Sequence, residues 1–291
     1  MFMEIPRQSL ICDIDCELFD LELDGGYLGC ARLFNGSGDG RAVLYLHGIQ
    51  SHGGWFLQSC DHLRRQGATV MAPDRRGSGL NGYDRGHCDS HGQLIADVDY
   101  CVDWLRQRTG IQQIDIAAVS WSGKLALAYA AEFADKVRSI SLVTPGLCAK
   151  IDISLREKIT VGLQGVVNPH RLHEIPLNDP ELFTANPDML RFIENDPIKL
   201  THATAAFFIA STHLDSTVRK IVSKLRPPVY LFLAENDHII DNQATIELLK
   251  PVLAGLPGSA ETVCAYPNAH HTLDFEPDPL TFFQDLALIY R

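Results

Sequence analysis

The chain has 291 residues, of which 46% are hydrophobic, and a formal net charge of −11. This length and composition suit a protein with one large core, or with a core and a smaller insertion. The acidic balance argues against nucleic-acid binding, which depends on lysine and arginine side chains that neutralise phosphates. No apolar run is long enough to cross a bilayer, so we expect no integral membrane segment.

The N-terminus and the cysteines favour a reducing compartment. The first residues, MFMEIPRQSLICDID, lack the basic stretch and apolar stretch of a secretory signal. The eight cysteines are scattered along the chain: Cys12, Cys16, Cys30, Cys60, Cys88, Cys101, Cys148 and Cys264. In a chain with a full-sized core, this pattern favours reduced, buried thiols over a disulfide framework. We therefore expect a cytoplasmic protein.

The first half of the chain predicts a hairpin followed by alternating strands and helices. Residues 16–23 and 27–34 flank Asp24–Gly25–Gly26, a pattern typical of an antiparallel hairpin. Strands are then expected at 42–46, 69–72, 114–119 and 137–143, and helices near 55–66, 94–108 and 123–132. This alternation predicts an α/β fold with a mostly parallel sheet that helices cover on both faces.

Between Pro145 and Arg226 the alternation stops. Helical patterns occupy 155–166, 187–194, 203–211 and 218–225, and no convincing strand is found among them. Four Asn–Pro or Asp–Pro pairs interrupt the region, and a helix does not easily continue through any of these prolines. A buried strand at 229–234 and a last strand within SAETVCAY follow.

Ser120 is the first candidate for chemistry. The segment IDIAAVSWSGK predicts a strand that ends at Ser120 and a helix that begins around Ser122–Gly123. Such a tight strand-to-helix turn lifts a serine hydroxyl above a sheet, and small residues are needed two positions before and after it. Ala118 and Ser122 satisfy that need. Ser122 is the rival nucleophile, but it would place the long side chain of Lys124 in the crowded position. A purely structural alternative is that Ser120 caps the helix.

An acid and a histidine follow in chain order, each after a predicted strand. Asp237 lies in the polar turn after 229–234, and His271 follows the Pro–Asn turn after the last strand. Serine, acid, histidine is the order of the triad in α/β-hydrolases. Asp241 is a weaker candidate because it begins a predicted helix, where an acidic cap is common. Glu235 would still lie on the strand.

No metal or cofactor is expected. His87, Cys88, Asp89 and His91 lie close together in GHCDSHG, but the paired ligand spacings typical of zinc sites are missing. No dinucleotide-binding fingerprint or phosphate-binding loop is present. His47 is expected to be structural.

These motifs resemble the α/β-hydrolase family, and within it the monoacylglycerol lipase and lysophospholipase-like branch. The resemblance covers nearly the whole chain and rests on the segments LHGIQSHGGW, PDRRGSGLN, AVSWSGKLALA, LAENDHIID and AHHTLDFE. It implies that Ser120 is the nucleophile, Asp237 the triad acid and His271 the base. It also implies that the backbone N–H groups of Ile49 and Trp121 form the oxyanion hole.

Three details qualify the match. Ala118 and Ser122 stand where the family usually has glycines, and Asn81 ends a turn that usually ends in serine. His270 precedes His271, so one of the two is expected to be structural. In the resembling branch a glutamate follows the base by five residues, and Glu276 sets that register on His271.

The resemblance also implies domains and a reaction. Residues 1–145 and 227–291 would form the hydrolase core, and 146–226 a helical cap above Ser120. The apolar side chains Phe183, Leu190, Phe192, Phe207 and Phe208 are candidates for its underside, although a small core within the cap is favoured for each. The expected activity is serine-dependent hydrolysis of carboxylic esters with medium or long acyl chains, through an acyl-enzyme on Ser120. The alternatives are a thioesterase, an acyltransferase and a non-catalytic small-molecule binder. The oligomeric state is not predicted.

Overall fold

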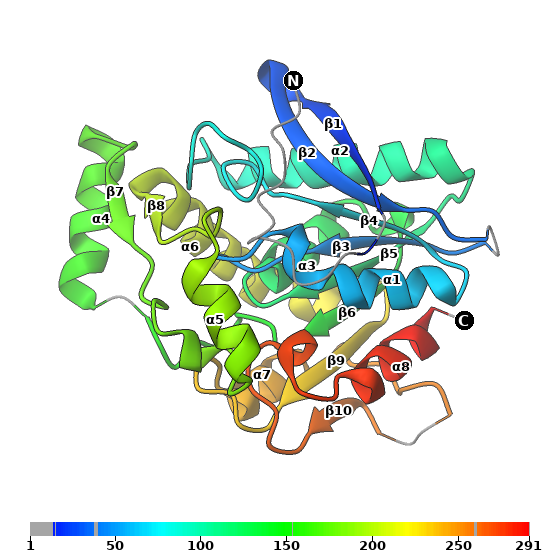
Figure 1. The fold of residues 1–291 in the computed structure, drawn as a ribbon. Coiled ribbons are helices and arrows are strands. Elements are labelled where there is room, and N and C mark those ends of the chain that lie inside the picture. The colour runs from blue at the N-terminus through cyan, green and yellow to red at the C-terminus, as the bar shows by residue number, and fades with distance from the viewer. Residues whose placement is uncertain (1–13, 15, 38–39, 153, 259–260, 291) are drawn as a thin grey trace.

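An eight-stranded sheet runs through the middle of the molecule (Figure 1). The computed structural model describes residues 14, 16–37, 40–152, 154–258 and 261–290, so Cys12 and most of the N-terminal segment considered above lie outside the described residues. In spatial order the strands are β1 (Glu17–Leu23), β2 (Tyr27–Phe34), β4 (Thr69–Pro73), β3 (Ala42–Leu46), β5 (Ile114–Val119), β6 (Val137–Val143), β9 (Val229–Ala234) and β10 (Val263–Tyr266). β1, β2 and β4 pair antiparallel and the other neighbours pair parallel. The predicted hairpin and mostly parallel sheet are confirmed.

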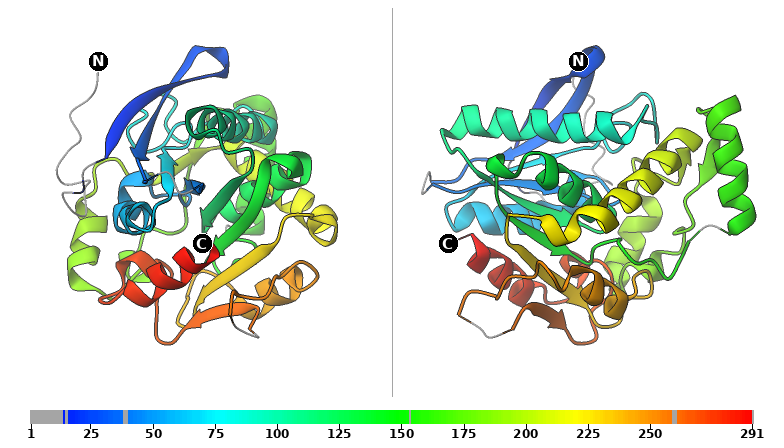
Figure 2. Two further views of the ribbon diagram at one scale, coloured as in Figure 1. Left: turned by 90° about the vertical axis from the view of Figure 1, so that its right-hand side faces the viewer. Right: turned by 180° about the vertical axis from the view of Figure 1, so that it is seen from behind.

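Helices cover both faces of this sheet. α1 (Leu57–Arg65) and α8 (Leu280–Ile289) contact each other on one face, whereas α2 (His91–Thr109) and α3 (Ser122–Glu132) contact each other on the opposite face (Figure 2). Every residue of β3 and β5 is buried, as expected for parallel strands between two helical layers. A 3₁₀ turn at Gly53–Phe56 precedes α1, and α7 (Asn242–Leu249) follows β9. α8 was not among the predicted elements.

The segment 146–226, called here the inserted segment, lies between β6 and β9. It contains α4 (Leu155–Val167), α5 (Pro187–Asn195) and α6 (Ala205–Ile221), which lie together at one side of the molecule (Figure 1). The asparagine–proline and aspartate–proline pairs fall at helix boundaries as predicted. α4 ends before Asn168, and Asn186 caps α5 by accepting a hydrogen bond from the Asp188 N–H.

Two predictions of secondary structure in the inserted segment are wrong. β7 (Leu172–Glu174) and β8 (His202–Thr204) form an antiparallel pair where no strand was expected. Three-residue strands are too short to show a period of two. α6 is one continuous helix where two were predicted, because Phe207, Ala210, Leu214 and Val218 bury one side of it.

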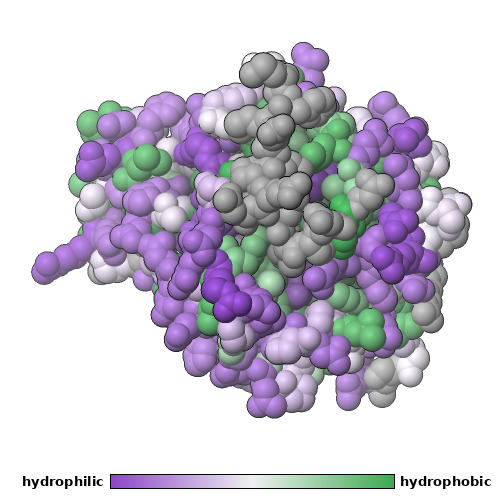
Figure 3. All heavy atoms as spheres, in the orientation of Figure 1, coloured by the Kyte–Doolittle hydropathy of each residue, from purple (hydrophilic) through white to green (hydrophobic). Residues whose placement is uncertain are grey.

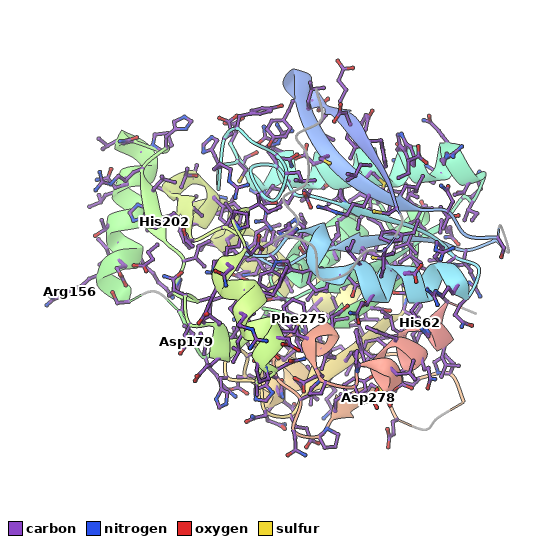
Figure 4. The ribbon with its side chains drawn as sticks, viewed as in Figure 1. His62, Arg156, Asp179, His202, Phe275 and Asp278 are labelled. Carbon is purple, nitrogen blue, oxygen red and sulfur yellow. The ribbon has the colours of Figure 1, made fainter. Side chains whose placement is uncertain are left out.

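Aromatic side chains join the inserted segment to the sheet core. The Trp55 ring lies 5.8 Å from Phe183, 6.0 Å from Phe192 and 5.1 Å from Phe275. Phe207 stacks on Trp121 with ring centres 5.0 Å apart. In Figure 4, Phe275 lies close to α5, whereas Arg156 extends into solvent from α4. The prediction of a separate small core is therefore wrong for Phe183, Phe192 and Phe207, which pack on core residues.

Asp196 anchors the end of α5 to the same part of the core. It accepts hydrogen bonds from Trp55 Nε1 at 2.8 Å and from the backbone N–H of Ile198 at 3.1 Å. His52 Nε2 lies 3.0 Å from Asp196 Oδ2, the oxygen that also accepts from Trp55, and the side chains of both His52 and Asp196 are fully buried. The pKa of Asp196 stays below its usual range because these bonds outweigh the effect of burial.

The outer face of α4 differs from the rest of the inserted segment. Four of its apolar side chains, Ile159, Leu163, Val166 and Val167, remain exposed. Apolar side chains appear over this helix at the upper left of Figure 3. On the opposite side of α4, the side chain of Val161 is buried.

Candidate active site

Ser120 occupies a strained turn between β5 and α3. Its φ of 53° lies in the left-handed region, which residues other than glycine rarely adopt. Its N–H donates to Val143 O at 2.9 Å, and its carbonyl accepts from Gly146 N at 2.8 Å. Ala118 is fully buried beneath it. The predicted strand–serine–helix turn is therefore present, and backbone hydrogen bonds to the end of β6 hold its strained conformation.

Ser120, His271 and Asp237 form one hydrogen-bonded chain. His271 Nε2 lies 2.9 Å from Ser120 Oγ, and His271 Nδ1 lies 2.8 Å from Asp237 Oδ2. The three residues are buried, with exposed fractions of 8%, 1% and 2% in that order. In this arrangement the serine hydroxyl donates to Nε2 while the Nδ1 proton is donated to the carboxylate. These three candidates lie far apart in the sequence, and the fold places them within hydrogen-bonding distance of one another.

Asp237 is held in its charged form. Burial raises the pKa of its carboxyl, but the contact with His271 and the N–H groups of Ile239 and Ile240 outweigh that effect, so the pKa lies below its usual range. Those two N–H groups donate to Oδ1 at 2.8 and 3.0 Å, which leaves Oδ2 for His271. The charged carboxylate can therefore accept the Nδ1 proton of His271 in a hydrogen bond.

The rival residues have other partners. Ser122 Oγ donates to the carbonyl of His47. Asp241 caps α7 by accepting from Ala244 N at 2.9 Å, as predicted. His270 lies beside Asn236 and Glu276, with Nδ1 3.2 Å from the Glu276 carboxylate. The prediction that Glu235 lies on the strand is wrong, because β9 ends at Ala234 and Glu235 is exposed in the turn that follows.

Ile49 and Trp121 flank the serine. A Cβ added to Gly48 would lie 3.3 Å from Ser120 Cβ and 3.7 Å from Ser120 Oγ, so the Gly48–Ile49 peptide lies against the hydroxyl. Trp121 follows the serine at the N-terminus of α3. Within the part of the chain that the structure describes, neither backbone N–H donates a hydrogen bond. Both are therefore free to bind a negatively charged oxygen.

His47 and the turn after β4 support this region. The His47 side chain accepts from Arg75 N at 2.9 Å through Nε2, so its proton is on Nδ1, which donates to Gly48 O at 2.8 Å. Burial and the neighbouring Arg75 lower the pKa of His47 to about 3. Asn81 Nδ2 donates to the carbonyls of Asp74 and Arg75 at 2.9 and 3.0 Å, in keeping with a structural role for this turn.

A cavity of about 790 Å³ opens beside the serine and extends between core and inserted segment. Ser120, Ile49 and Trp121 are among the residues that line it. Much of the wall is apolar, including Val161 of α4, Leu177, Phe208 and Ile209. Of the aromatic candidates, Phe208 lines this cavity, whereas Phe183 packs edge-on against His271 at 5.9 Å. The volume and the apolar wall fit a substrate with a hydrocarbon part.

Residues 39–278 match the model of a hydrolase family described as serine aminopeptidase, S33. The match spans most of the chain. The chain belongs to this family. Its fold is the α/β-hydrolase fold, as predicted. None of the curated protein sequences compared with it matches the chain.

Solved structures of lipases and an esterase resemble the chain over nearly its whole length. The monoacylglycerol lipase of Paleococcus ferrophilus is 19% identical, with a TM-score of 0.79, over 94% of this chain and 100% of that one. A soluble variant of the Saccharomyces cerevisiae monoglyceride lipase, bound to a substrate analogue, is 18% identical with a TM-score of 0.80, over 94% of each chain. A carboxyl esterase from Bacillus coagulans is 14% identical with a TM-score of 0.75, over 95% of this chain and 96% of that one.

The histidine-rich segment near α2 is held by hydrogen bonds in this member of the family. His87 contacts Thr204 Oγ1 at 3.0 Å and Asp89 at 3.3 Å, and its ring stacks on that of His170. Among the described residues, no three histidine, cysteine, aspartate or glutamate side chains are grouped so as to hold a metal ion. In the same part of the chain, no helix is long and apolar enough to span a bilayer.

Proposed function

We propose that the chain hydrolyses carboxylic esters through an acyl-enzyme on Ser120. The observation that carries the proposal is the chain of contacts from Ser120 Oγ through His271 to Asp237, at 2.9 and 2.8 Å, beside a cavity with a largely apolar wall. A serine hydroxyl is a poor nucleophile by itself, and a histidine within hydrogen-bond reach is what activates it.

In the proposed reaction, Ser120, His271, Asp237 and the two N–H donors act in both halves, acylation and deacylation. Ser120 Oγ attacks the ester carbonyl carbon while His271 Nε2 takes its proton, and Asp237 stabilises the imidazolium. The carbonyl π electrons move to the oxygen, which accepts hydrogen bonds from Ile49 and Trp121 N–H. The intermediate collapses, the bond to the alcohol oxygen breaks, and His271 protonates that oxygen. Water then repeats the cycle on the acyl-enzyme and releases the acid.

The charges in the cavity favour an ester over the substrate of an aminopeptidase. A protonated amino terminus that leaves water is stabilised best by a carboxylate that no other cation neutralises. Three aspartates line the cavity, and each has a partner: Asp152 pairs with Lys158, Asp215 with Lys124, and Asp241 caps α7. The lipase and esterase neighbours also support an acyl ester, and the cavity supports a medium or long acyl chain.

We also propose that the inserted segment, residues 146–226, acts as a cap on a core made of 1–145 and 227–291. Residues of α4 and α6 contribute to the cavity wall, while Ser120 comes from the core. A cytoplasmic location is supported by six of the cysteines, which are reduced thiols: Cys30, Cys60, Cys88, Cys101, Cys148 and Cys264.

The first test measures hydrolysis of p-nitrophenyl esters of increasing acyl length by wild type, Ser120→Ala and Ser122→Ala. We expect Ser120→Ala to lose at least about a thousandfold in kcat, and Ser122→Ala to remain active. Equal loss in both serine variants would contradict the assignment of the nucleophile. A matched pair of oxygen ester and coenzyme A thioester tests the alternative, since a thioesterase would prefer the thioester.

A further inference from the structure

Arg75 makes contacts on the side of the Gly48–Ile49 peptide away from the substrate cavity. Its Nη1 donates to Gly48 O at 2.9 Å and its Nη2 donates to Ile49 O at 2.9 Å. The guanidinium carbon also lies 4.8 Å from the centre of the Trp121 ring. One side chain therefore contacts both residues whose N–H groups flank Ser120.

The bonds to Arg75 fix the direction of an N–H group. Gly48 C=O and Ile49 N–H belong to the same planar peptide, and in a trans peptide these two groups point in opposite directions. Arg75 and His47 both donate to the Gly48 carbonyl, so they hold the Ile49 N–H pointing the other way. A hydrogen bond into the carbonyl also polarises the peptide and makes its N–H a stronger donor.

The charge of Arg75 is not neutralised by a neighbour. Arg32 pairs with Asp74, and Arg76 pairs with Asp97 at 2.6 Å. By contrast, no carboxylate among the described residues lies within ion-pair distance of Arg75. Burial lowers the pKa of the guanidinium to about 10, so it remains charged at neutral pH. Its partners are carbonyl oxygens and the faces of Trp121 and Phe207.

Arg75 is also absent from the lining of the cavity beside Ser120. A group that does not touch the bound substrate changes binding of the ground state little. Its effect is confined to the stage at which negative charge develops on the carbonyl oxygen.

We propose that Arg75 is a positioning residue for the oxyanion hole: it holds and polarises the Gly48–Ile49 peptide and packs against the ring of Trp121, whose backbone N–H is the second donor. The inference rests on the proposed function, since it concerns the intermediate formed during ester hydrolysis. The Arg75 cation would stabilise the negative charge on the reacting oxygen through the one peptide group that lies between them.

The test compares Arg75→Met and Arg75→Lys with Arg76→Met. Arg76 is the matched control because it is the neighbouring arginine in the same turn but bonds to Asp97. For each folded variant, kcat and KM are measured with the best p-nitrophenyl ester. Inhibition is measured with a trifluoromethyl ketone of the same acyl chain, to which Ser120 adds to give a charged tetrahedral oxygen, and with the product acid, which forms no such bond.

We expect Arg75→Met to lower kcat by about tenfold or more, since loss of a whole oxyanion donor costs about a hundredfold or more. KM and inhibition by the product acid should change little, while inhibition by the trifluoromethyl ketone weakens by the same factor as kcat. Arg75→Lys should recover part of the loss. Arg76→Met should reduce thermal stability and leave kcat per folded molecule near that of wild type.

The outcomes separate this inference from the proposed function. If wild type is active and Arg75→Met keeps both its kcat and its ketone affinity, the role of Arg75 is wrong and the function stands. If Arg75→Met weakens inhibition by the ketone and by the product acid equally, Arg75 shapes the pocket in general, and the inference is also overturned. If wild type hydrolyses no ester, the proposed function fails and the inference fails with it.

Discussion

The sheet core and the inserted segment contribute to the site in different ways. The core supplies Ser120 and Asp237 from the ends of β5 and β9, which are paired on both sides, and His271 from the loop after the edge strand β10. The inserted segment supplies wall residues such as Val161 and Phe208 from helices, one of which, α4, leaves its outer face exposed. We therefore expect chemistry and substrate selection to be carried by separable parts of the molecule. Changes in the core should affect every ester, and changes in the inserted segment should affect some esters only.

The largest effect is expected from Asp237→Asn in the core. The amide lacks the charge that stabilises the imidazolium and favours the wrong histidine tautomer, so kcat should fall by about 10⁴-fold for all chain lengths. Asp241→Asn is the matched control, because asparagine caps helices as well as aspartate does. The kcat of each variant is measured by steady-state kinetics with short and long esters. Similar losses in the two variants would argue against Asp237 as the triad acid.

Acidification should weaken the core through His47. Its pKa is about 3 in the folded protein against 6.5 ordinarily, so between these values the unfolded chain binds a proton that the native one does not. Stability is therefore fully present above pH 6.5 and falls as the pH decreases, by up to about 1.4 kcal/mol per pH unit. Urea unfolding from pH 7 to 4.5 measures the slope, and His47→Gln should flatten it. An unchanged slope in that variant would contradict a buried, neutral His47.

A change within the inserted segment should alter selection without abolishing the reaction. Val161 faces the cavity from α4, so Val161→Trp should lower kcat/KM for a decanoate ester by about tenfold while an acetate ester changes little. Val166→Trp is the control on the same helix, since Val166 is 86% exposed and does not line the cavity. Equal losses on both esters would break the proposed division of roles.

The smallest effect is expected from removing a helix cap. Asp241→Ala leaves the Ala244 N–H without its partner and should lower the free energy of unfolding by about 1 kcal/mol. Urea denaturation of wild type and Asp241→Ala measures this difference. No loss of stability would show that the Asp241 bond contributes little to α7.

Sequence reasoning worked best where local geometry dictates the residue types. The bounds of β3, β5 and β6 were predicted to the residue, because buried β-branched runs end in polar or small residues there. The crowded turn at Ser120 likewise admits only small neighbours, which favoured Ser120 over Ser122. Whether Asp237 reaches His271 depends on two strand ends that meet only in the folded sheet.

Features with no local signal were missed. The pair β7 and β8 joins segments about thirty residues apart through three-residue strands, too short for a detectable period. Phe183 and Phe192 were assigned to a core of the inserted segment because nothing in their spacing reveals that Trp55 fills the space between them. The contacts of Arg75 with the Gly48 and Ile49 carbonyls are long-range too. The pair of arginines in PDRRGSGLN, of which Arg75 is the first, was the one sign in the sequence.

The central claim is that Ser120 is the activated serine of this chain, and labelling with a fluorophosphonate tests it most directly. The probe forms a bond to the activated serine oxygen with loss of fluoride, and peptide mapping by mass spectrometry locates it. We predict stoichiometric modification of Ser120 in wild type, none in Ser120→Ala, and normal labelling in Ser122→Ala. Modification of another serine, or none in wild type, would contradict the account.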